Sequence, residues 1–404
     1  MSVGGGSSLP ALAGELAGTR AGALSIDTLQ HVLDRADART IPINVSLELT
    51  HACNVDCEMC YLDLVPDSKI DALRTDEWKR ILGELKAAGT LFVTLTGGEP
   101  LLRKDFFEIA QHARELSLAI TIFTNGTLID ERNADRIAAL HPLGVEISLL
   151  GGIAATHDAI AQRRGAFEKT IAGARRLRAR GIPVLFKCVL MEKNVRERAL
   201  IRAIADELGC RSYFDVEVSP KDNGSAAPQA LAARDEDLVQ ALREMRAESD
   251  ETFGPAEETP RAERLAMTPC AAGRRTCQIG PTGDVFPCTQ WSEPVGNLRK
   301  TSFASLWNGD ATLHKIRATH IGDLPVCAEC DLLTVCGPCM ALSLMETGSI
   351  GPSPTKCAAA EVRARAEGIA GRSAWFAKLE AEAAAQDSAR GRPLRARVRL
   401  PLVG

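Results

Sequence analysis

The run "VSLELTHACNVDCEMCYL", residues 45–62, joins a short apolar segment to a loop that contains three cysteines. The apolar segment is typical of a β-strand. Cys53, Cys57 and Cys60 follow it with the spacing CxxxCxxC. Thiolates favour zinc, copper(I) or iron–sulfur clusters, and structural zinc sites normally close all four positions. Three thiolates in one loop leave a position open, so this loop is a candidate metal site with room for another ligand.

Two kinds of metal site are compatible with this loop. Three cysteines suit three corners of an iron–sulfur cube, whose fourth iron is then free to bind a substrate. Alternatively, His51, two residues before the first cysteine, would complete a Cys3His zinc site. We favour the iron–sulfur cluster, because structural zinc sites usually pair their cysteines as CxxC with a second pair nearby.

The composition restricts the class of protein. The chain has 404 residues, 45% of them hydrophobic, which is enough for one large domain and a smaller one. The net charge is −4 and the basic residues are spread along the chain, so we predict no nucleic-acid partner. We see neither a signal peptide nor a membrane-length apolar run, so we predict a cytoplasmic protein without membrane association. In that reducing compartment, 13 cysteines indicate metal binding rather than disulfides.

Residues 44–225 alternate strand-like segments with segments whose apolar residues recur at helical spacing. This alternation predicts an α/β fold with a parallel sheet and right-handed crossovers. Six such units are too few for an eight-stranded barrel and suit a partial (β/α)6 barrel. The expected strands are 45–50, 91–96, 119–124, 145–150, 183–190 and 213–218.

Polar residues follow each of these strands. The cysteine loop comes after the first strand, "TGGEP" (96–100) after the second and "TNGT" (124–127) after the third. Ser148 and Lys187 lie near the ends of the fourth and fifth strands. Because parallel barrels build their active sites at the carboxyl ends of the strands, we expect these groups to converge on one mouth.

A second group of cysteines follows a stretch rich in Ala, Glu and Arg at 226–265, which we interpret as a helical bridge. Eight thiols suffice for two four-thiolate clusters, although "CAEC" (327–330) and "CGPC" (336–339) also imitate a zinc ribbon. Cys188 and Cys210 lie outside both groups, and we expect them to be small buried hydrophobes. The eight are Cys270, Cys277, Cys288, Cys327, Cys330, Cys336, Cys339 and Cys357.

The combined motifs resemble those of radical S-adenosylmethionine (SAM) enzymes. The likeness rests on CxxxCxxC followed by the aromatic Tyr61, and then on "GGEP". The segments "CQIGPTGDVFPC" (277–288) and "CAECDLLTVCGPC" (327–339) resemble the C-terminal SPASM extension of such enzymes. The resemblance implies a partial TIM-like barrel with a SPASM domain, SAM as cofactor, and three [4Fe–4S] clusters.

The resemblance also implies which cysteines hold each cluster. Cys53, Cys57 and Cys60 would hold the cluster that binds SAM. By position in the motif, the first auxiliary cluster would take Cys270, Cys277, Cys288 and Cys339. The second would take Cys327, Cys330, Cys336 and Cys357. Only two residues separate Cys336 from Cys339, where relatives usually have three.

Cofactor contacts are implied in the same way. Glycines at 97 and 98 let backbone approach a ligand closely, and Glu99 offers a charge acceptor for an ammonium group. The resemblance assigns Gly97, Gly98 and Glu99 to the amino group of SAM. Asn125 and Ser148 match positions near the methionine and ribose parts. Lys187 would meet the SAM carboxylate or a substrate acid, and Tyr61 completes the cysteine motif.

We divide the chain into five parts. Residues 1–43 form an N-terminal extension with a helix expected at 25–36, and residues 44–225 form the barrel. The bridge at 226–265 leads to the SPASM domain at 266–360. Residues 361–404 form a helical and basic tail, and residues 358–385 are expected to form an alanine-rich helical run.

The function implied by the resemblance is reductive cleavage of SAM to a 5′-deoxyadenosyl radical, followed by hydrogen abstraction from a ribosomally made peptide. The expected partners are a precursor peptide, a separate peptide-recognition protein and a reductant such as flavodoxin or ferredoxin. Two alternatives remain. In the first, the same chemistry acts on a small molecule or a sulfatase residue; in the second, the chain is a non-catalytic metal-binding scaffold.

Overall fold

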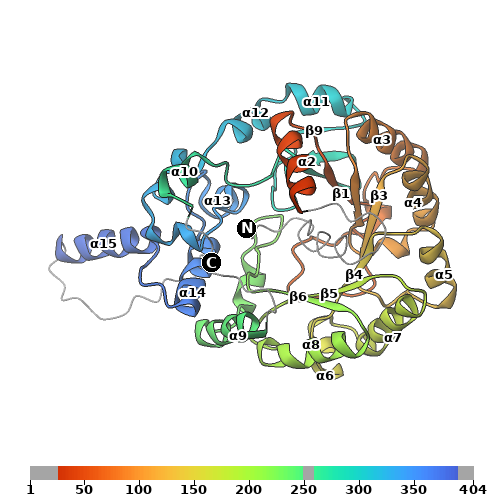
Figure 1. Cartoon of the computed structure of the whole chain (residues 1–404), viewed down its shortest axis with the longest axis horizontal. Helices are drawn as coiled ribbons and strands as arrows, with labels where there is room; N and C mark the ends of the chain where they lie inside the picture. The colour runs from red at the N-terminus through yellow and green to blue at the C-terminus, as the bar shows by residue number, and fades with distance from the viewer. Residues whose placement is uncertain (1–25, 249–258, 390–404) are drawn as a thin grey trace.

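The structure is a computed structural model that describes residues 26–248 and 259–389 (Figure 1). Its centre is a nine-stranded sheet in the order β6-β5-β4-β3-β2-β1-β7-β8-β9. β1 to β7 pair in parallel, and β8 and β9 continue the sheet antiparallel. The strands are β1 (Asn44–Glu48), β2 (Phe92–Thr96), β3 (Ala119–Thr124), β4 (Gly144–Ser148), β5 (Val184–Val189), β6 (Arg211–Asp215), β7 (Thr276–Ile279), β8 (Asp284–Phe286) and β9 (Gly296–Asn297).

The predicted partial α/β barrel is confirmed, and all six expected strands form within a few residues of their predicted bounds. Helices cover the outer side of the curved sheet (Figure 1). Those of the barrel are α3 (Thr75–Ala87), α4 (Phe106–Glu115), α5 (Glu131–Ala139), α6 (Ala154–Ile160), α7 (Ala166–Ala179) and α8 (Arg198–Glu207). The helix expected at 25–36 forms as α2 (Ile26–Ala38).

Strand alternation divides the sheet into an apolar and a polar face. Val45 and Leu47 of β1 are fully buried in the main core, together with Trp78 of α3. The residues that alternate with them, Ser46 and Glu48, face the opposite way. This opposite face, here called the inner face, also carries Thr94, Thr121, Glu146, Ser148 and Lys187, as the strand register shows. The barrel is therefore closed on the outside by helices and lined on the inside by polar groups.

The sequence predicted a sheet of six strands, but the observed sheet has three more. β7 comes from the cysteine-rich region and pairs with β1, in the register Val45 with Cys277 and Leu47 with Ile279. β7, β8 and β9 have four, three and two residues, too short for a periodic signal in the sequence. Gly283, with φ of 91°, lies in the turn between β7 and β8.

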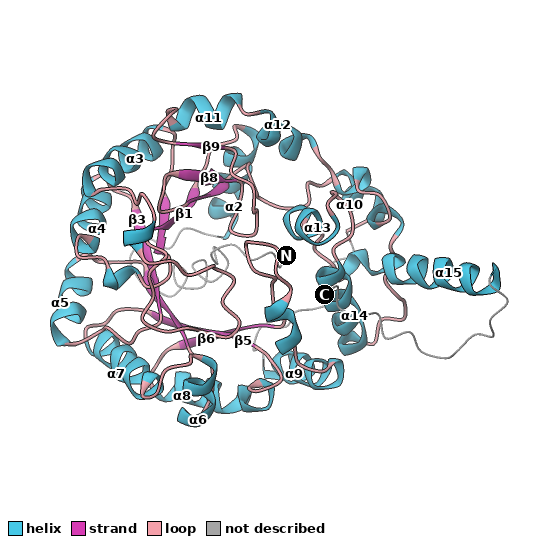
Figure 2. Ribbon diagram, turned by 180° about the vertical axis from the view of Figure 1, so that it is seen from behind, coloured by secondary structure: helices cyan, strands magenta, loops and turns pink. Residues whose placement is uncertain are grey.

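The C-terminal part is helical and packs against the barrel side of the molecule. α14 lies beside α9, and α15 extends away from the rest (Figure 2). The helical run expected at 358–385 forms as two helices, because Gly368 adopts φ of 72° and ends α14. The helices are α9 (Asp235–Glu248), α10 (Arg261–Ala266), α11 (Phe303–Gly309), α12 (Ala311–Ala318), α13 (Met340–Thr347), α14 (Pro354–Glu367) and α15 (Ala374–Ala389). The basic stretch 390–404 lies outside the described residues.

No helix in 26–248 or 259–389 is long and apolar enough to cross a membrane.

Candidate active site

The CxxxCxxC loop follows β1 and is held in place by backbone hydrogen bonds to the end of α6. The backbone amide of Asp56 donates to the Ala161 carbonyl at 3.1 Å, and the backbone amide of Glu58 donates to the Ile160 carbonyl at 3.0 Å. Within the loop, the Cys60 amide donates to the Cys57 carbonyl at 3.0 Å, which turns the chain between the two cysteines. A distant element of the barrel therefore fixes the loop's course.

The structure brings the three thiols of this loop together. Burial and the neighbouring Cys60 and Cys53 thiols raise the pKa of Cys57 to about 12. Burial likewise raises the pKa of Cys60 to about 11. Three adjacent thiolates without a cation would repel one another in this half-buried place, whereas a bound metal cluster would compensate their charge. The three side chains thus fit the iron–sulfur cluster that their spacing predicts.

His51, the alternative zinc ligand, turns toward the barrel. Its Nε2 lies 3.5 Å from Oε2 of Glu48, a carboxylate with 2% exposure at the end of β1. Tyr61, the aromatic residue of the motif, donates its hydroxyl to Oε1 of the same glutamate at 2.9 Å. Burial and the charge of Glu48 raise the pKa of Tyr61 well above its usual value. Glu48 thus joins both ends of the cysteine loop to the first strand.

The glycines after β2 are required by the backbone that they touch. A Cβ on Gly97 would lie 2.3 Å from the Thr50 carbonyl oxygen, and its φ of 142° already favours glycine. A Cβ on Gly98 would lie 2.3 Å from the Ala52 carbonyl oxygen. The Gly98 amide donates a hydrogen bond to the Thr50 carbonyl oxygen at 2.7 Å. The close approach therefore joins this loop to the cysteine loop; contact of the glycines with SAM stays a prediction.

Glu99 is fully buried, and its carboxylate joins the loops after β2 and β3. It accepts hydrogen bonds from the Leu101 amide at 3.0 Å, the Thr124 hydroxyl at 2.8 Å and the Asn125 amide at 2.8 Å. Burial raises its pKa to about 7, and the three hydrogen bonds hold it from rising further. A carboxylate has about four acceptor positions, so one more donor can be accommodated.

Asn125 connects the third strand to the cysteine loop. Its amide nitrogen donates to Oδ1 of Asn54 at 2.9 Å and lies 3.9 Å from the sulfur of Cys53. Its own Oδ1 accepts from the hydroxyl of Thr127 at 2.6 Å. The side chain therefore stands beside the first cysteine, between two of the loops that the sequence predicts to meet.

Ser148 and Lys187 lie on the inner face, next to each other in the register of β4 and β5. The Lys187 ammonium lies 3.1 Å from Oε2 of Glu146 and 5.1 Å from the centre of the Phe123 ring. The lysine thus already pairs with a carboxylate of the neighbouring strand. Its expected contact with the SAM carboxylate stays a prediction.

Four of the C-terminal thiols gather in one place. Burial is the main cause that raises the pKa of Cys327, Cys336 and Cys357. The charge of at least one other thiol of the group raises each of these three pKa values further, so the thiols lie close together. They line a common cavity together with Leu333 and Trp375. The four are Cys327, Cys330, Cys336 and Cys357, the set expected for the second auxiliary cluster.

A second set contains three thiols, not the expected four. Cys270, Cys288 and Cys339 pack against the apolar cluster around Trp291, which Cys327 of the other set also touches. After burial, the proximity of Cys339 and Cys270 raises the pKa of the Cys288 thiol. Cys277 is elsewhere, fully packed in the core of the barrel. The set predicted for the first auxiliary cluster is therefore divided between two cores.

A buried ion-pair group lies between the two sets of thiols. The Lys356 ammonium contacts the Glu217 carboxylate at 2.5 Å, and Arg363 contacts the same carboxylate. Burial raises the pKa of the Cys339, Cys270 and Cys336 thiols, and the nearby charge of Lys356 partly offsets this. One cation therefore stands near cysteines of both auxiliary sets, and Glu217 ties it to the end of β6.

The sequence reasoning missed several residues of these networks. A charged residue near the end of an apolar strand, Glu48, was the available signal for the first network. Asn54 lies inside the cysteine loop, but its contact with Asn125 depends on a residue 71 positions away. Lys356 directly precedes the last cysteine ligand, and a lysine there is ordinary unless its burial is known. Cys188 and Cys210 are buried, in agreement with their predicted packing role.

Sequence comparisons match two family profiles to the chain. The radical SAM superfamily matches residues 47–203, and an iron–sulfur cluster-binding SPASM domain matches residues 270–331. A pre-haem d1 synthase of Dinoroseobacter shibae is 30% identical, with 77% of this chain and 85% of that protein aligned. An AdoMet-dependent haem synthase of Methanosarcina barkeri is 29% identical (76% and 93%), and a PqqA peptide cyclase of Xanthomonas euvesicatoria 29% (81% and 91%).

Solved structures share the fold. SuiB of Streptococcus suis has a TM-score of 0.61 at 18% identity, over 82% of both chains. The structure of anSMEcpe with bound AdoMet has a TM-score of 0.60 at 18% identity, over 80% of this chain and 96% of that one. Profiles, relatives and the partial barrel with its cysteine-rich extension agree. The chain belongs to the radical SAM superfamily, as an enzyme with a C-terminal SPASM iron–sulfur cluster-binding domain.

Proposed function

We propose that this enzyme reductively cleaves SAM and modifies a ribosomally made peptide by hydrogen abstraction. When bound, the cluster at Cys53, Cys57 and Cys60 would supply the electron that converts SAM to a 5′-deoxyadenosyl radical. The single observation that carries the proposal is the junction of the three loops after β1, β2 and β3. The cysteine loop, Glu99 and Asn125 are joined there by direct hydrogen bonds.

The residues of this junction would bind and orient the cofactor. Three protein groups already donate hydrogen bonds to the Glu99 carboxylate. Its remaining acceptor position would take a hydrogen bond from the SAM ammonium. Asn125 would keep the third loop against Cys53 and present a polar edge beside the cluster. Ser148 on the inner face would contact the nucleoside part.

The charges of the inner face support a peptide substrate. Toward the carboxyl ends of the strands, the register brings Glu48, Glu146 and Asp215 to this face, with Lys187 as the cation among them. Lys187 is already paired with Glu146. A polycarboxylated substrate would add negative charge to this surface, whereas a peptide with neutral or basic side chains would not. The similarity to a PqqA peptide cyclase over 81% of the chain also supports a peptide.

The relatives that act on haem compounds favour a second candidate, a carboxylated tetrapyrrole. A pre-haem d1 synthase and a haem synthase are as similar in sequence as the peptide cyclase. Such a substrate would need several cations, and among the described strand residues the register places Lys187 and Arg211 on the inner face, the first of them already paired with Glu146. It would have to bind outside this face, for example against the auxiliary region.

The substrate class can be tested by isotope transfer. The full chain is reconstituted anaerobically and incubated with SAM, reduced flavodoxin and each short peptide encoded beside its gene. With the true substrate we expect 5′-deoxyadenosine to form and the peptide to change mass. Deuterium placed on the peptide should appear in 5′-deoxyadenosine. Deuterium transfer from a labelled tetrapyrrole, with every peptide unchanged, would reject the peptide and support the second candidate.

A further inference from the structure

Cys277 lies on a face of the sheet that the other thiols do not reach. It is paired with Val45 across β7 and β1, and Ile279 is paired with Leu47. Because strand side chains alternate, Cys277 and Ile279 point to the same side as Val45 and Leu47. That side is the helix-covered core of the barrel. Cys277 is 1% exposed there.

The surroundings of Cys277 are those of a packing residue. It belongs to the apolar cluster that contains Leu313 of α12 and Trp307 of α11. The charged neighbour is Arg317, whose guanidinium stacks 4.6 Å from the centre of the Trp307 ring and donates to the Gly273 carbonyl at 2.6 Å.

Cys270, Cys288 and Cys339 occupy a different apolar cluster, around Trp291 and Met340. The charge of Cys339 acts on both Cys270 and Cys288, and that of Cys270 on Cys288, which places the three close together, whereas the charged neighbour of Cys277 is Arg317. In sequence, Cys277 lies only seven positions after Cys270. The strand that begins at Thr276 nevertheless turns it into the other core. Moving Cys277 to the three thiols would require breaking the pairing of β7 with β1.

We propose that the first auxiliary site is a three-thiolate site: Cys270, Cys288 and Cys339 hold its cluster, Cys277 does not, and one iron is left for a ligand other than cysteine. The proposal rests on the iron–sulfur function proposed above, and it removes Cys277 from the ligands expected from sequence. The first auxiliary cluster would then resemble the SAM-binding cluster in having one iron that exchangeable ligands can reach.

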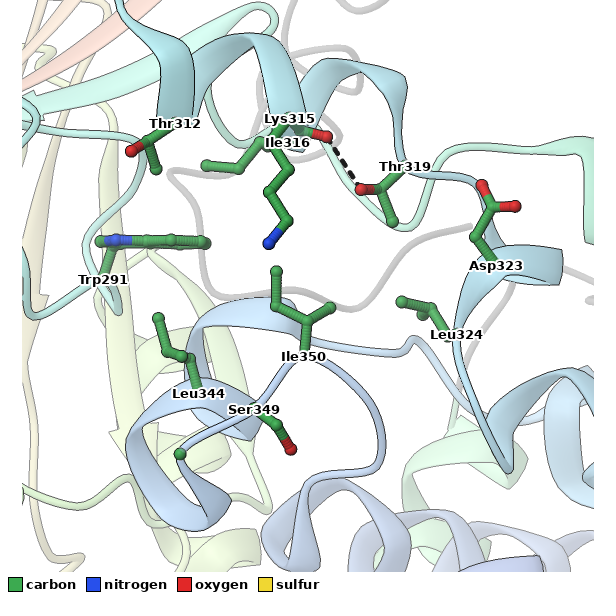
Figure 3. Close-up of a pocket in the computed structure, with 11 residues that line it drawn as sticks. Trp291, Thr312, Lys315, Ile316, Thr319, Asp323, Leu324, Leu344, Ser349 and Ile350 are labelled. Atoms are coloured by element: carbon green, nitrogen blue, oxygen red, sulfur yellow. Dashed lines mark hydrogen bonds between the residues drawn. The ribbon is translucent and has the colours of Figure 1, made fainter.

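A pocket lies against the same apolar cluster and offers such ligands a route. Trp291, Ile316 and Leu324 line this pocket and also belong to the cluster that packs on the three thiols. Figure 3 shows the Trp291 ring on one side of the pocket, with Leu344 and Ile350 beneath the side chain of Lys315. The pocket therefore borders the apolar cluster that packs against the three thiols. Cys277, in contrast, lies in the barrel core, which helices cover on its outer side.

The first test uses the loss of iron from a cluster with three thiolates. In the full-length variant with Cys53, Cys57 and Cys60 all changed to Ala, only the auxiliary clusters remain. We expect ferricyanide to take one electron from the first of them and one ferrous ion to leave, so that [4Fe–4S]2+ becomes [3Fe–4S]+. The EPR signal of the three-iron cluster and loss of about one of about eight irons are the expected results. No three-iron signal would overturn the proposal.

The second test compares two thiols within the same background. Cys277→Val keeps an apolar side chain of similar size in the barrel core, so we expect unchanged iron content and an unchanged EPR spectrum after reduction. Cys288→Ala is the matched control and should lose about half of the remaining iron. If folded Cys277→Val, checked by circular dichroism, loses as much iron as Cys288→Ala, Cys277 is a ligand and the proposal is wrong.

These readouts separate the proposal from the proposed function. Iron content and EPR spectra of the triple variant do not depend on SAM cleavage or on any peptide. Zinc in place of iron in that variant would reject the iron–sulfur function itself. A normal iron content without the three-iron signal would reject only the three-thiolate site.

Discussion

Replacing Glu99 with glutamine tests whether this buried carboxylate binds the SAM ammonium. Burial raises the pKa of Glu99 from its ordinary value of 4.5 to about 7, against the hydrogen bonds from Asn125, Leu101 and Thr124. This difference corresponds to about 3 kcal/mol. Because the folded pKa is higher than the unfolded one, the protonated side chain favours folding below pH 4.5. That contribution is lost as the pH rises through about 7.

A bound cationic cofactor would stabilise the ionised carboxylate of Glu99, which burial disfavours in the free protein. If only ionised Glu99 binds the ammonium, SAM affinity of the wild-type protein should rise up to about tenfold per pH unit below pH 7 and level off above it. Glu99→Gln should show no such rise. At pH 8 the lost charged hydrogen bond, worth about 1.5–3 kcal/mol, should weaken binding about 10- to 100-fold. At pH 6 the two proteins should differ by about tenfold less.

Isothermal titration calorimetry on anaerobically reconstituted protein measures these affinities, and the ratio of variant to wild type cancels titration of SAM itself. Thr124→Val is the matched control, because it removes one donor to Glu99 and keeps the carboxylate. It should retain the pH dependence with its midpoint at higher pH, since the hydrogen bond lowers the pKa. Parallel pH profiles for wild type and Glu99→Gln would refute the ammonium contact and leave Glu99 a structural bridge.

Three further perturbations address the loops and the auxiliary sites. Gly98→Ala would place a Cβ 2.3 Å from the Ala52 carbonyl oxygen, so we expect up to about a third less iron and weaker SAM binding; Gly309→Ala, with open space around it, should match wild type. Lys356→Met removes a cation near both auxiliary sets and should lower both reduction potentials in an EPR-monitored titration. A shift of about 60 mV would correspond to about 1.4 kcal/mol, and unchanged potentials would contradict the argument. Cys339→Ala should keep uncoupled SAM cleavage by product chromatography but lose peptide modification; full modification would show that the first auxiliary cluster is dispensable.

Much of the fold could be predicted because each barrel strand carries its own local signal. Runs rich in apolar and β-branched residues occur at every position from β1 to β6, and their order alone implies a parallel sheet. The gathering of the loops at one mouth follows from the same topology. β7 could not be predicted in this way, since four residues of mixed polarity have no recognisable period.

The candidate site was predictable in its residue types but not in all of its contacts. The glycines of "GGEP" indicate a close approach, which the sequence reasoning gave to a ligand. In the structure the carbonyls of Thr50 and Ala52 fill that space. The family resemblance assigns Cys327, Cys330, Cys336 and Cys357 to one set, and they do line one cavity. It could not show that Cys277 enters the barrel core, because strand alternation decides which core a thiol enters, and the position of a cysteine in a motif does not contain this information.

The same short strand explains how the two cysteine regions keep their separation. β1 leads directly into the SAM-cluster loop, and β7, its hydrogen-bonded neighbour, lies between Cys270 and Cys288 in sequence. Parallel pairing over Asn44 to Leu47 therefore fixes both regions to one rigid ladder, with Cys277 in the core as part of its packing. Electron transfer between clusters depends steeply on separation, so a ladder of this kind would hold it constant while loops and pocket accommodate substrate. A variant that loosens β7 should then impair turnover more than SAM cleavage, even with every cluster ligand intact.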